Sequence, residues 1–480
     1  MRGAGYARAR RPSRCSRASG QLEGPKGKQR AGRRSSRIVE EVHRATEAGR
    51  REVSWRYLNP KLEGPVLIKT VLNQCHPLKS FVYGKMWLAG GELSVDVLPR
   101  KNSRPRCGEC LRPGPTYDTA RTPRLFAFVP LWGFAVVLLY YVRRVECAGC
   151  GVRAEQLPWA TGKQRTCNVY RQFLARWARR LSWSEVAEVF GTSWGVVYRA
   201  VRWIVDYGIA HRSLDGVSAI GVDEIAVWSG HRYLTVVYQL DEGMRRLVWV
   251  GRERTETTLL AFFDFFGAAR SKLLRFIASD MWRPYLTAIA ERAGQAIHVL
   301  DRYHVVAKLN KAVDEVRAKE ARELVRNGFE PVLKHTRWCF LKRRENLTPT
   351  QGLKLRDILH YDLRSVRAYL LKQAFEAFWL YTAPHWAGWF LDRWCTRAMR
   401  SRLEPFKKFA GTLRTHRELL LNWFRAKKAI STGIVEGLNA NAKLAVRKAR
   451  GFRTYEATET ALYHVLGRLP EPEWTHTFCR

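Results

Sequence analysis

The stretch Ser218-Ala-Ile-Gly-Val-Asp223 decides the fold, because a short apolar run ends there in a carboxylate. A second stretch of the same kind follows further along the chain, Leu274-Arg-Phe-Ile-Ala-Ser-Asp280. Short apolar runs bounded by polar or turn residues are typical of buried strands. Each stretch therefore predicts a strand with an aspartate at its carboxyl end.

The surrounding sequence predicts a mixed sheet. Three runs have strand character and are joined by short turns: Val217–Val227, Tyr233–Gln239 and Leu247–Gly251. A helix over Thr257–Phe266 precedes the strand that ends at Asp280, and a further helix precedes a strand, Ala296–Leu300, that ends at Asp301. Three antiparallel strands followed by alternating helices and strands predict a mixed α/β catalytic core with the element order of an RNase H-like fold.

A third carboxylate, Glu436, lies in Ser431-Thr-Gly-Ile-Val-Glu-Gly-Leu-Asn439. This stretch predicts the start of a helix with Ser431 or Thr432 as its N-cap. Two strand-end aspartates and one helical glutamate suit a pair of Mg²⁺ ions about 3.5–4 Å apart at a phosphodiester. Taken singly, an aspartate after a strand is also often a turn former or a helix cap.

Composition indicates a polyanionic partner. The 480 residues include 84 Lys and Arg against 43 Asp and Glu, which gives a net charge of +41. Such an excess, spread along the whole chain, is typical of nucleic-acid binders. A membrane surface would also attract it, but the basic residues are not confined to one amphipathic helix.

Residues 125–142 lack charge over a length that is marginal for a membrane span. Pro130 and Gly133 interrupt this segment, and its β-branched and aromatic residues are typical of strands. We predict a buried β-hairpin, no membrane segment and no signal peptide.

Ten cysteines include two Cys-x-x-Cys pairs. Two such pairs are the ligand set of a structural zinc ribbon, with four thiolates in a tetrahedron: Cys107, Cys110, Cys147 and Cys150. The interval between the pairs is longer than usual, and we expect a long hairpin to fill it. The alternative is a reduced pair of knuckles without metal.

A helix-turn-helix is predicted after the cysteines. Ser184–Phe190 reads as a short helix, Gly191 as the turn, and Ser193 as the cap of a second helix from Trp194 to Val205. The second helix would be the recognition helix in the DNA major groove, presenting Arg199 and Arg202. Any helical hairpin with a glycine turn would share this pattern.

The stretch from Val305 to Lys428 is helical in pattern and rich in tryptophan, with five tryptophans from Trp338 to Trp394: Trp338, Trp379, Trp386, Trp389 and Trp394. They either pack the core of this helical segment, or one of them stacks on an unpaired DNA base. Downstream, Asn439 and Lys443 share a helix face with Glu436. Lys443 would contact phosphate if it faces the metal site, and the alternative is a lysine exposed to solvent.

With these residues identified, the chain resembles the DDE transposases of the ISL-three insertion-sequence family from about Leu72 to Gly467. The most specific motifs are Gly221-Val-Asp-Glu-Ile225, Ser279-Asp-Met-Trp-Arg-Pro-Tyr285, Leu300-Asp-Arg-Tyr-His-Val-Val306 and Thr432-Gly-Ile-Val-Glu-Gly-Leu-Asn439. The resemblance implies that Asp223, Asp280 and Glu436 are the catalytic triad and hold two Mg²⁺ or Mn²⁺ ions. Asp301 and His304 match a D-x-x-H signature of related transposases, and Asp301 competes with Asp280 for the second ligand position.

The expected domain organisation follows from the motifs and the resemblance. We predict a basic, disordered arm or start-site extension (1–64), a zinc-ribbon domain (65–165), a helix-turn-helix DNA-binding domain (166–212), the first part of the RNase H-like core (213–311), a helical insertion (312–428), the final core helix (429–468) and a tail (469–480).

The function implied is two-metal cleavage and strand transfer of DNA at the terminal repeats of an insertion sequence. The expected partners are those repeats, the target duplex and further copies of the chain in a synaptic homo-oligomer, in the nucleoid-associated cytoplasm of a prokaryote. The alternatives are a domesticated or inactive DNA-binding regulator, which would not need the carboxylates, and a structure-selective nuclease, which would not need a sequence-reading N-terminal half.

Overall fold

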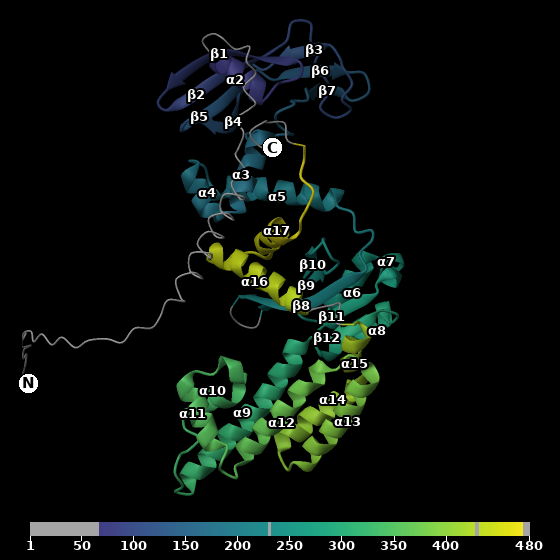
Figure 1. The fold of residues 1–480 in the computed structure, drawn as a ribbon. Helices are drawn as coiled ribbons and strands as arrows, with labels where there is room; N and C mark the ends of the chain where they lie inside the picture. The colour runs from purple at the N-terminus through teal and green to yellow at the C-terminus, as the bar shows by residue number, and fades with distance from the viewer. Residues whose placement is uncertain (1–66, 229–231, 428–431, 474–480) are drawn as a thin grey trace, which may run out of the picture. The chain divides into compact units, whose positions relative to one another are not determined.

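The computed structural model describes residues 67–228, 232–427 and 432–473 (Figure 1). The described residues from Ile68 onward form one compact unit. The predicted arm at 1–64 and the last residues of the predicted tail lie outside the described residues. The described chain contains both helices and sheets, so the predicted mixed α/β class is confirmed.

The first sheet has the strand order β1-β2-β5-β4. Its elements follow helix α2 (Ile68–Cys75) and are β1 (Phe81–Ala89), β2 (Glu92–Pro99), β4 (Arg124–Leu131) and β5 (Phe134–Tyr140). Strands β2 and β5 pair in parallel, whereas β1 with β2 and β4 with β5 form antiparallel hairpins. The hairpin predicted for residues 125–142 is therefore confirmed.

The expectation that this hairpin is buried holds for one face only. Phe126 and Leu138 are fully buried, whereas Leu125 is 50% exposed and Trp132, at the turn, is 74% exposed. Alternate side chains of a strand point to opposite faces, so a sheet packed on one side buries every second residue. None of the described helices combines the length and apolar character needed to cross a bilayer.

The cysteine pairs lie beside a second sheet of order β3-β6-β7, formed by β3 (Thr116–Thr119), β6 (Arg143–Cys147) and β7 (Gly151–Ala154). The expected long hairpin between the cysteine pairs does exist as β4–β5, but it pairs with β2 in the first sheet. The chain leaves the cysteine-bearing sheet after β3 and returns to it at β6.

Three helices follow: α3 (Asn168–Ala178), α4 (Trp183–Val189) and α5 (Trp194–His211). Ser182 caps α4 in a capping box with Glu185, and the Ser193 hydroxyl accepts a hydrogen bond from the N–H of Val196 at the start of α5. Gly191, between α4 and α5, has a φ of +56°, a conformation that costs glycine little. The two predicted helices and their turn are present, and α5 extends six residues beyond the predicted end.

The third sheet has the order β10-β9-β8-β11-β12. Strands β8, β9 and β10 are antiparallel, and β11 pairs in parallel with both β8 and β12. The predicted strands are thus present as β8 (Ala219–Trp228), β9 (Arg232–Gln239), β10 (Arg246–Arg252), β11 (Phe276–Ser279) and β12 (Ile297–Leu300). The accompanying helices are α6 (Glu256–Phe266), α7 (Ala268–Leu273) and α8 (Arg283–Ala293), and the apolar side chains of α6 and α8 share a core with β8 and β11.

Residues from Arg302 to Arg425 are mostly helical, and their buried apolar side chains form a core that also includes Val299 and Leu300 of β12. The elements are α9 (Arg302–Arg326), α10 (Arg337–Leu341), η1 (Arg344–Asn346), α11 (Pro349–Ile358), α12 (Arg364–Glu376), η2 (Ala377–Leu380), α13 (Pro384–Arg400), α14 (Glu404–Thr415) and α15 (Arg417–Arg425). Helix α9 runs without a break across residues 311 and 312, where we predicted a boundary between the first part of the core and the helical insertion. This one helix therefore connects the third sheet directly to the helical segment.

The five tryptophans from Trp338 to Trp394 divide into a buried group and an exposed group. Trp379 and Trp394 are 5% and 4% exposed and belong to its core. Trp338, Trp386 and Trp389 are 54%, 56% and 49% exposed. The core-packing interpretation is therefore correct for two of the five.

Two helices complete the described chain, α16 (Thr432–Lys448) and α17 (Tyr455–Leu466). Helix α16 contacts β8, and α17 contacts both β10 and α5 (Figure 1). The loop between them carries Phe452, whose ring lies 4.8 Å from that of Trp183 on α4. The helix that carries Glu436 therefore adjoins the third sheet, and the loop at its end adjoins α4.

Candidate active site and metal centre

Asp223 lies within β8, and both of its carboxylate oxygens accept hydrogen bonds. The backbone N–H of Glu224 donates to Oδ1 at 2.8 Å, and the side-chain amide of Asn439 donates to Oδ2 at 2.5 Å. Asn439 is buried, and its carbonyl oxygen accepts a hydrogen bond of 2.8 Å from the Tyr238 hydroxyl. This Tyr238–Asn439–Asp223 chain fixes the rotamer of the aspartate.

Burial raises the pKa of Asp223 above its usual value. The two hydrogen bonds and the nearby His304 oppose this shift, whereas the negative charge of Asp301 adds to it. Burial and a neighbouring negative charge both disfavour the ionised form of Asp223, so a bound cation would stabilise that form.

Asp280 immediately follows β11, the parallel neighbour of β8. The strand register pairs Ala278 with Gly221, and each aspartate comes two residues after its member of that pair. Asp223 and Asp280 therefore occupy equivalent positions on adjacent parallel strands. Asp280 directly follows its strand, as predicted, whereas β8 continues past Asp223 to Trp228, so the prediction that Asp223 ends its strand is wrong.

Glu224 and Asp223 have different partners, as expected for consecutive residues of a strand. Glu224 forms a salt bridge with Arg254, whose guanidinium also lies 3.7 Å from Asp280 and stacks over the ring of Trp282 at 4.4 Å. Burial raises the pKa of Glu224 to about 7, although Arg254 opposes the shift.

Sequence reasoning missed Arg254. It is one arginine among many, in the segment after β10, and only the sheet brings it to Asp280. It supplies a positive charge between two carboxylates and so lowers the repulsion among the acidic groups of this site.

His304 lies between the two aspartates that compete for the second ligand position. Its Nδ1 is 3.7 Å from Asp280 and its Nε2 is 3.7 Å from Asp301. Asp301 is the N-cap of α9, since its side chain accepts a hydrogen bond of 2.7 Å from the N–H of Tyr303. Asp301 therefore acts as a helix cap, which is one of the alternative roles expected for an aspartate after a strand.

Glu436 lies on α16 one turn before Asn439 and is exposed to solvent. Helix α16 approaches β8 closely at Gly221, where an added Cβ would lie 2.6 Å from Val435. Gly221 therefore permits the helix packing that places Asn439 on Asp223. Lys443, one further turn along, is exposed.

The four cysteines are gathered at the second sheet, with Cys147 at the end of β6, Cys150 in the turn before β7, and Cys107 and Cys110 ahead of β3. Within the described ranges, Cys107, Cys110, Cys147 and Cys150 are the one group of three or more metal-ligating side chains whose ligand atoms all lie within 4.8 Å of one another. Hydrogen bonds, the largest from the backbone N–H of Gly149, lower the pKa of Cys147 to about 7, which favours its thiolate form, whereas the neighbouring thiols raise the pKa of Cys150. Four clustered sulfur ligands fit a structural Zn²⁺ ion, with no position open for catalysis.

Arg199 and Arg202 are exposed on α5, while Val197 and Val201 on its other side are fully buried. Arg202 lies 3.7 Å from Asp206 in an exposed ion pair. The exposed face of α5 is therefore basic and accessible in the described part of the chain.

The sheet, the neighbouring Asp223 and Asp280 and the exposed basic face of α5 are together typical of a protein that acts on nucleic acid. The family model that matches residues 220–462 is described as a transposase. A transposase of insertion sequence element IS1001 from Bordetella parapertussis is 29% identical over 338 residues, covering 70% of this chain and 82% of the relative. A transposase of insertion sequence element IS1557 from Mycobacterium tuberculosis is 30% identical over 394 residues, covering 77% and 87%. The chain belongs to the ISL-three family of DDE transposases.

Proposed function

We propose that this chain cleaves DNA at the ends of an insertion sequence and joins the freed ends to target DNA. The observation that carries the proposal is the equivalent placement of Asp223 and Asp280 on adjacent parallel strands, with Asn439 joining the Glu436 helix to Asp223. The order β10-β9-β8-β11-β12 supports an RNase H-like core interrupted by the helical segment.

In this proposal Asp223, Asp280 and Glu436 hold two Mg²⁺ or Mn²⁺ ions. Their carboxylate oxygens are hard ligands of the type that these cations prefer. When bound, such a pair lowers the pKa of a water molecule or a 3′-hydroxyl and stabilises charge at the phosphodiester. Asn439 and the N–H of Glu224 orient Asp223, and His304 and Arg254 lie beside Asp280.

The N-terminal half would select the DNA. We assign structural Zn²⁺ to the four cysteines and sequence reading to α5, with Arg199 and Arg202 as base-reading candidates. Double-stranded terminal repeats and target DNA are the proposed partners. Synapsis of two element ends would require at least two copies of the chain.

Cleavage of an element end by the purified full-length chain tests the proposal. Terminal inverted repeats that flank the gene supply the duplex, which is incubated with Mg²⁺, and nicked and joined products are separated on denaturing gels. We expect cleavage and joining by the wild type and neither by Asp223→Asn, Asp280→Asn or Glu436→Gln, with affinity for the duplex retained.

The Asp301→Asn variant discriminates between the two candidate second ligands. If Asp280→Asn retained strand transfer and Asp301→Asn lost it, Asp301 would be the second ligand. If all three triad variants remained active, the proposed site would be wrong.

A further inference from the structure

A basic groove of about 770 Å³ lies in the helical segment, on α12, α13 and the turn that follows α13. Trp389, Arg393, Arg397 and Arg400 line it from α13. Their spacing of four, four and three residues places them on one face of that helix. Arg367 of α12 and Arg402 of the turn complete a set of five arginines around one tryptophan.

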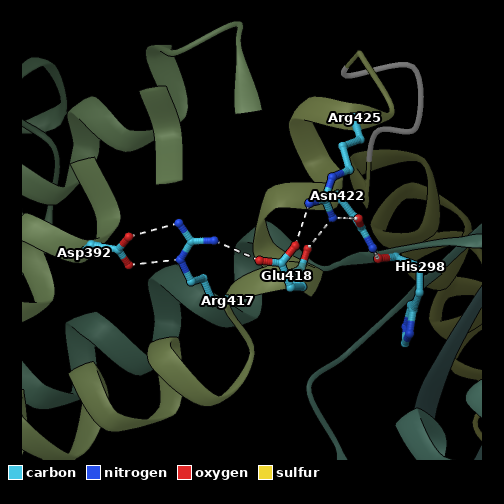
Figure 2. A network of polar contacts seen from close by, with 6 residues as sticks. All are labelled: His298, Asp392, Arg417, Glu418, Asn422 and Arg425. Carbon is cyan, nitrogen blue, oxygen red and sulfur yellow. Dashed lines mark hydrogen bonds and ion pairs between the residues drawn. The ribbon is translucent and has the colours of Figure 1, made fainter. Parts of the chain in front are cut away.

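The arginines of this groove are not neutralised by the protein. Among the described residues, none of the five forms a salt bridge with a carboxylate. The one acidic residue of the lining, Asp392, accepts hydrogen bonds of 3.0 and 2.9 Å from Arg417 (Figure 2). The groove therefore presents a concentrated positive charge, which fits the phosphates of a nucleic acid.

Trp389 adds a second kind of contact. The guanidinium of Arg393 stacks 4.5 Å from its ring centroid, yet 49% of the residue remains exposed. An accessible indole beside phosphate-binding arginines is suited to stacking on a nucleobase. In a duplex, the faces of the bases are covered by neighbouring bases, so the combination favours unpaired nucleotides.

We propose that this groove binds an unpaired segment of DNA, with the base stacked on Trp389 and the phosphates held by the arginines. The binding itself does not depend on the cleavage chemistry. The origin of the strand rests on the proposed function: it would be DNA unpaired next to the cleaved end.

A polar network connects the groove to the third sheet (Figure 2). From Asp392 it continues through Arg417 to Glu418 at 2.8 Å, and from Glu418 to Arg425 at 2.5 Å. Arg425 donates to Asn422, which in turn donates a hydrogen bond of 2.8 Å to the backbone carbonyl of His298 on β12.

Strand β12 ends one residue before Asp301, so this network holds the wall of the groove against the strand that leads to the candidate active site. A DNA strand in the groove would therefore be held in a defined position relative to that site.

Crosslinking and affinity of the full-length chain test the groove. The probe is a thymidine oligonucleotide carrying one 5-iodouracil, compared with a duplex of equal length. We expect ultraviolet crosslinking to place the iodouracil on Trp389, and Trp389→Ala to weaken single-strand binding about tenfold. Duplex affinity should change much less. Trp338→Ala is the matched control, because Trp338 is also exposed and stacked by an arginine, Arg337, but lies outside the groove.

The salt dependence of binding tests the arginines. Arg397→Gln should reduce the slope of log affinity against log salt by about 0.7 for the single strand, as loss of one phosphate contact predicts. Arg356→Gln, an exposed arginine of α11, should leave the slope unchanged.

Equal single-strand affinities for Trp389→Ala and Trp338→Ala, with crosslinks elsewhere, would overturn the assignment of the groove. Equal losses on single strand and duplex would show a general phosphate-binding surface and would also overturn it. Neither result bears on cleavage by the triad, and a chain without cleavage activity would still show the Trp389 crosslink if the groove is correct.

Discussion

Asn439 donates a hydrogen bond of 2.5 Å to Asp223, and this contact joins the helix that carries Glu436 to the strand that carries the first aspartate. The two residues are 216 positions apart in the chain, with the whole helical segment between them. The relative placement of two proposed metal ligands thus depends on one buried amide.

Replacement of Asn439 should therefore affect activity. We expect Asn439→Ala to lower the rate of end cleavage about 10- to 100-fold, because Asp223 would lose an orienting partner. The buried Tyr238 hydroxyl would also lose its acceptor, at a cost of about 1–3 kcal/mol in stability. Single-turnover cleavage and thermal unfolding measure the two effects. The exposed Asn441 of the same helix provides the control, and an equal effect of Asn441→Ala would contradict this role for Asn439.

The cysteine cluster should contain one Zn²⁺ per chain. Elemental analysis of the purified protein should find that stoichiometry, and Cys107→Ser or Cys150→Ser should reduce it and impair folding of the second sheet. Cys75→Ser, outside the cluster, should leave the zinc content unchanged. A well-folded, DNA-binding sample without zinc would show that the cluster is not a metal site.

The exposed arginines of α5 should read DNA sequence. Arg199→Ala or Arg202→Ala should each cost about 1–3 kcal/mol in binding to the element's ends and relax specificity. Arg180→Ala, an exposed arginine between α3 and α4, should weaken specific and random duplexes alike, as loss of a phosphate contact would. Competition assays with both duplexes at fixed salt distinguish the cases. Equal losses on both duplexes for Arg199→Ala and Arg202→Ala would remove α5 from base reading.

Tryptophans in the helical segment should differ in their effect on stability. Trp394 is buried and donates a hydrogen bond of 2.9 Å to the carbonyl of Leu371, and its ring packs against Phe375. Trp394→Ala should lower the free energy of unfolding by about 3–5 kcal/mol. Trp338→Ala should change it little, because that side chain is 54% exposed. Denaturant titrations measure the free energy of unfolding of both variants. Equal losses for Trp394→Ala and Trp338→Ala would show that the exposed fraction of a tryptophan does not determine its contribution to stability.

Two buried histidines should make the protein sensitive to acid. Burial lowers the pKa of His298 to about 4 and that of His464 to about 3. A histidine with a lowered folded-state pKa binds protons preferentially in the unfolded state. The free energy of unfolding is therefore fully retained above about pH 6.5 and falls below that pH. Each should cost roughly 1.4 kcal/mol per pH unit below pH 6.5, until its folded-state pKa is reached.

Thermal unfolding between pH 7.5 and pH 5 measures this loss. His464→Gln should make the decline shallower, whereas the exposed His360→Gln should not alter it. A decline of the same steepness in all three proteins would place the acid sensitivity elsewhere.

Local sequence patterns determined the secondary structure and several candidate residues. The strands around Asp223 and Asp280 were predictable, because buried strands need continuous apolar runs and their ends need polar residues. The turn and the start of α5 were predictable from Gly191 and Ser193, whose turn and capping chemistry acts within a few residues, whereas the Ser182 cap of α4 was not anticipated. The four cysteines were predictable because knuckle geometry requires a fixed short spacing.

Tertiary structure alone decided which of these residues meet. The contact between Asn439 and Asp223, the approach of Arg254 to Asp280 and the sheet that receives the β4–β5 hairpin all join segments far apart in the chain. The burial of Trp379 and Trp394 and the exposure of Trp389 also depend on how the helices pack. Local propensity and periodicity act over a turn or a strand, whereas these contacts depend on sheet order and helix packing, which such patterns do not encode.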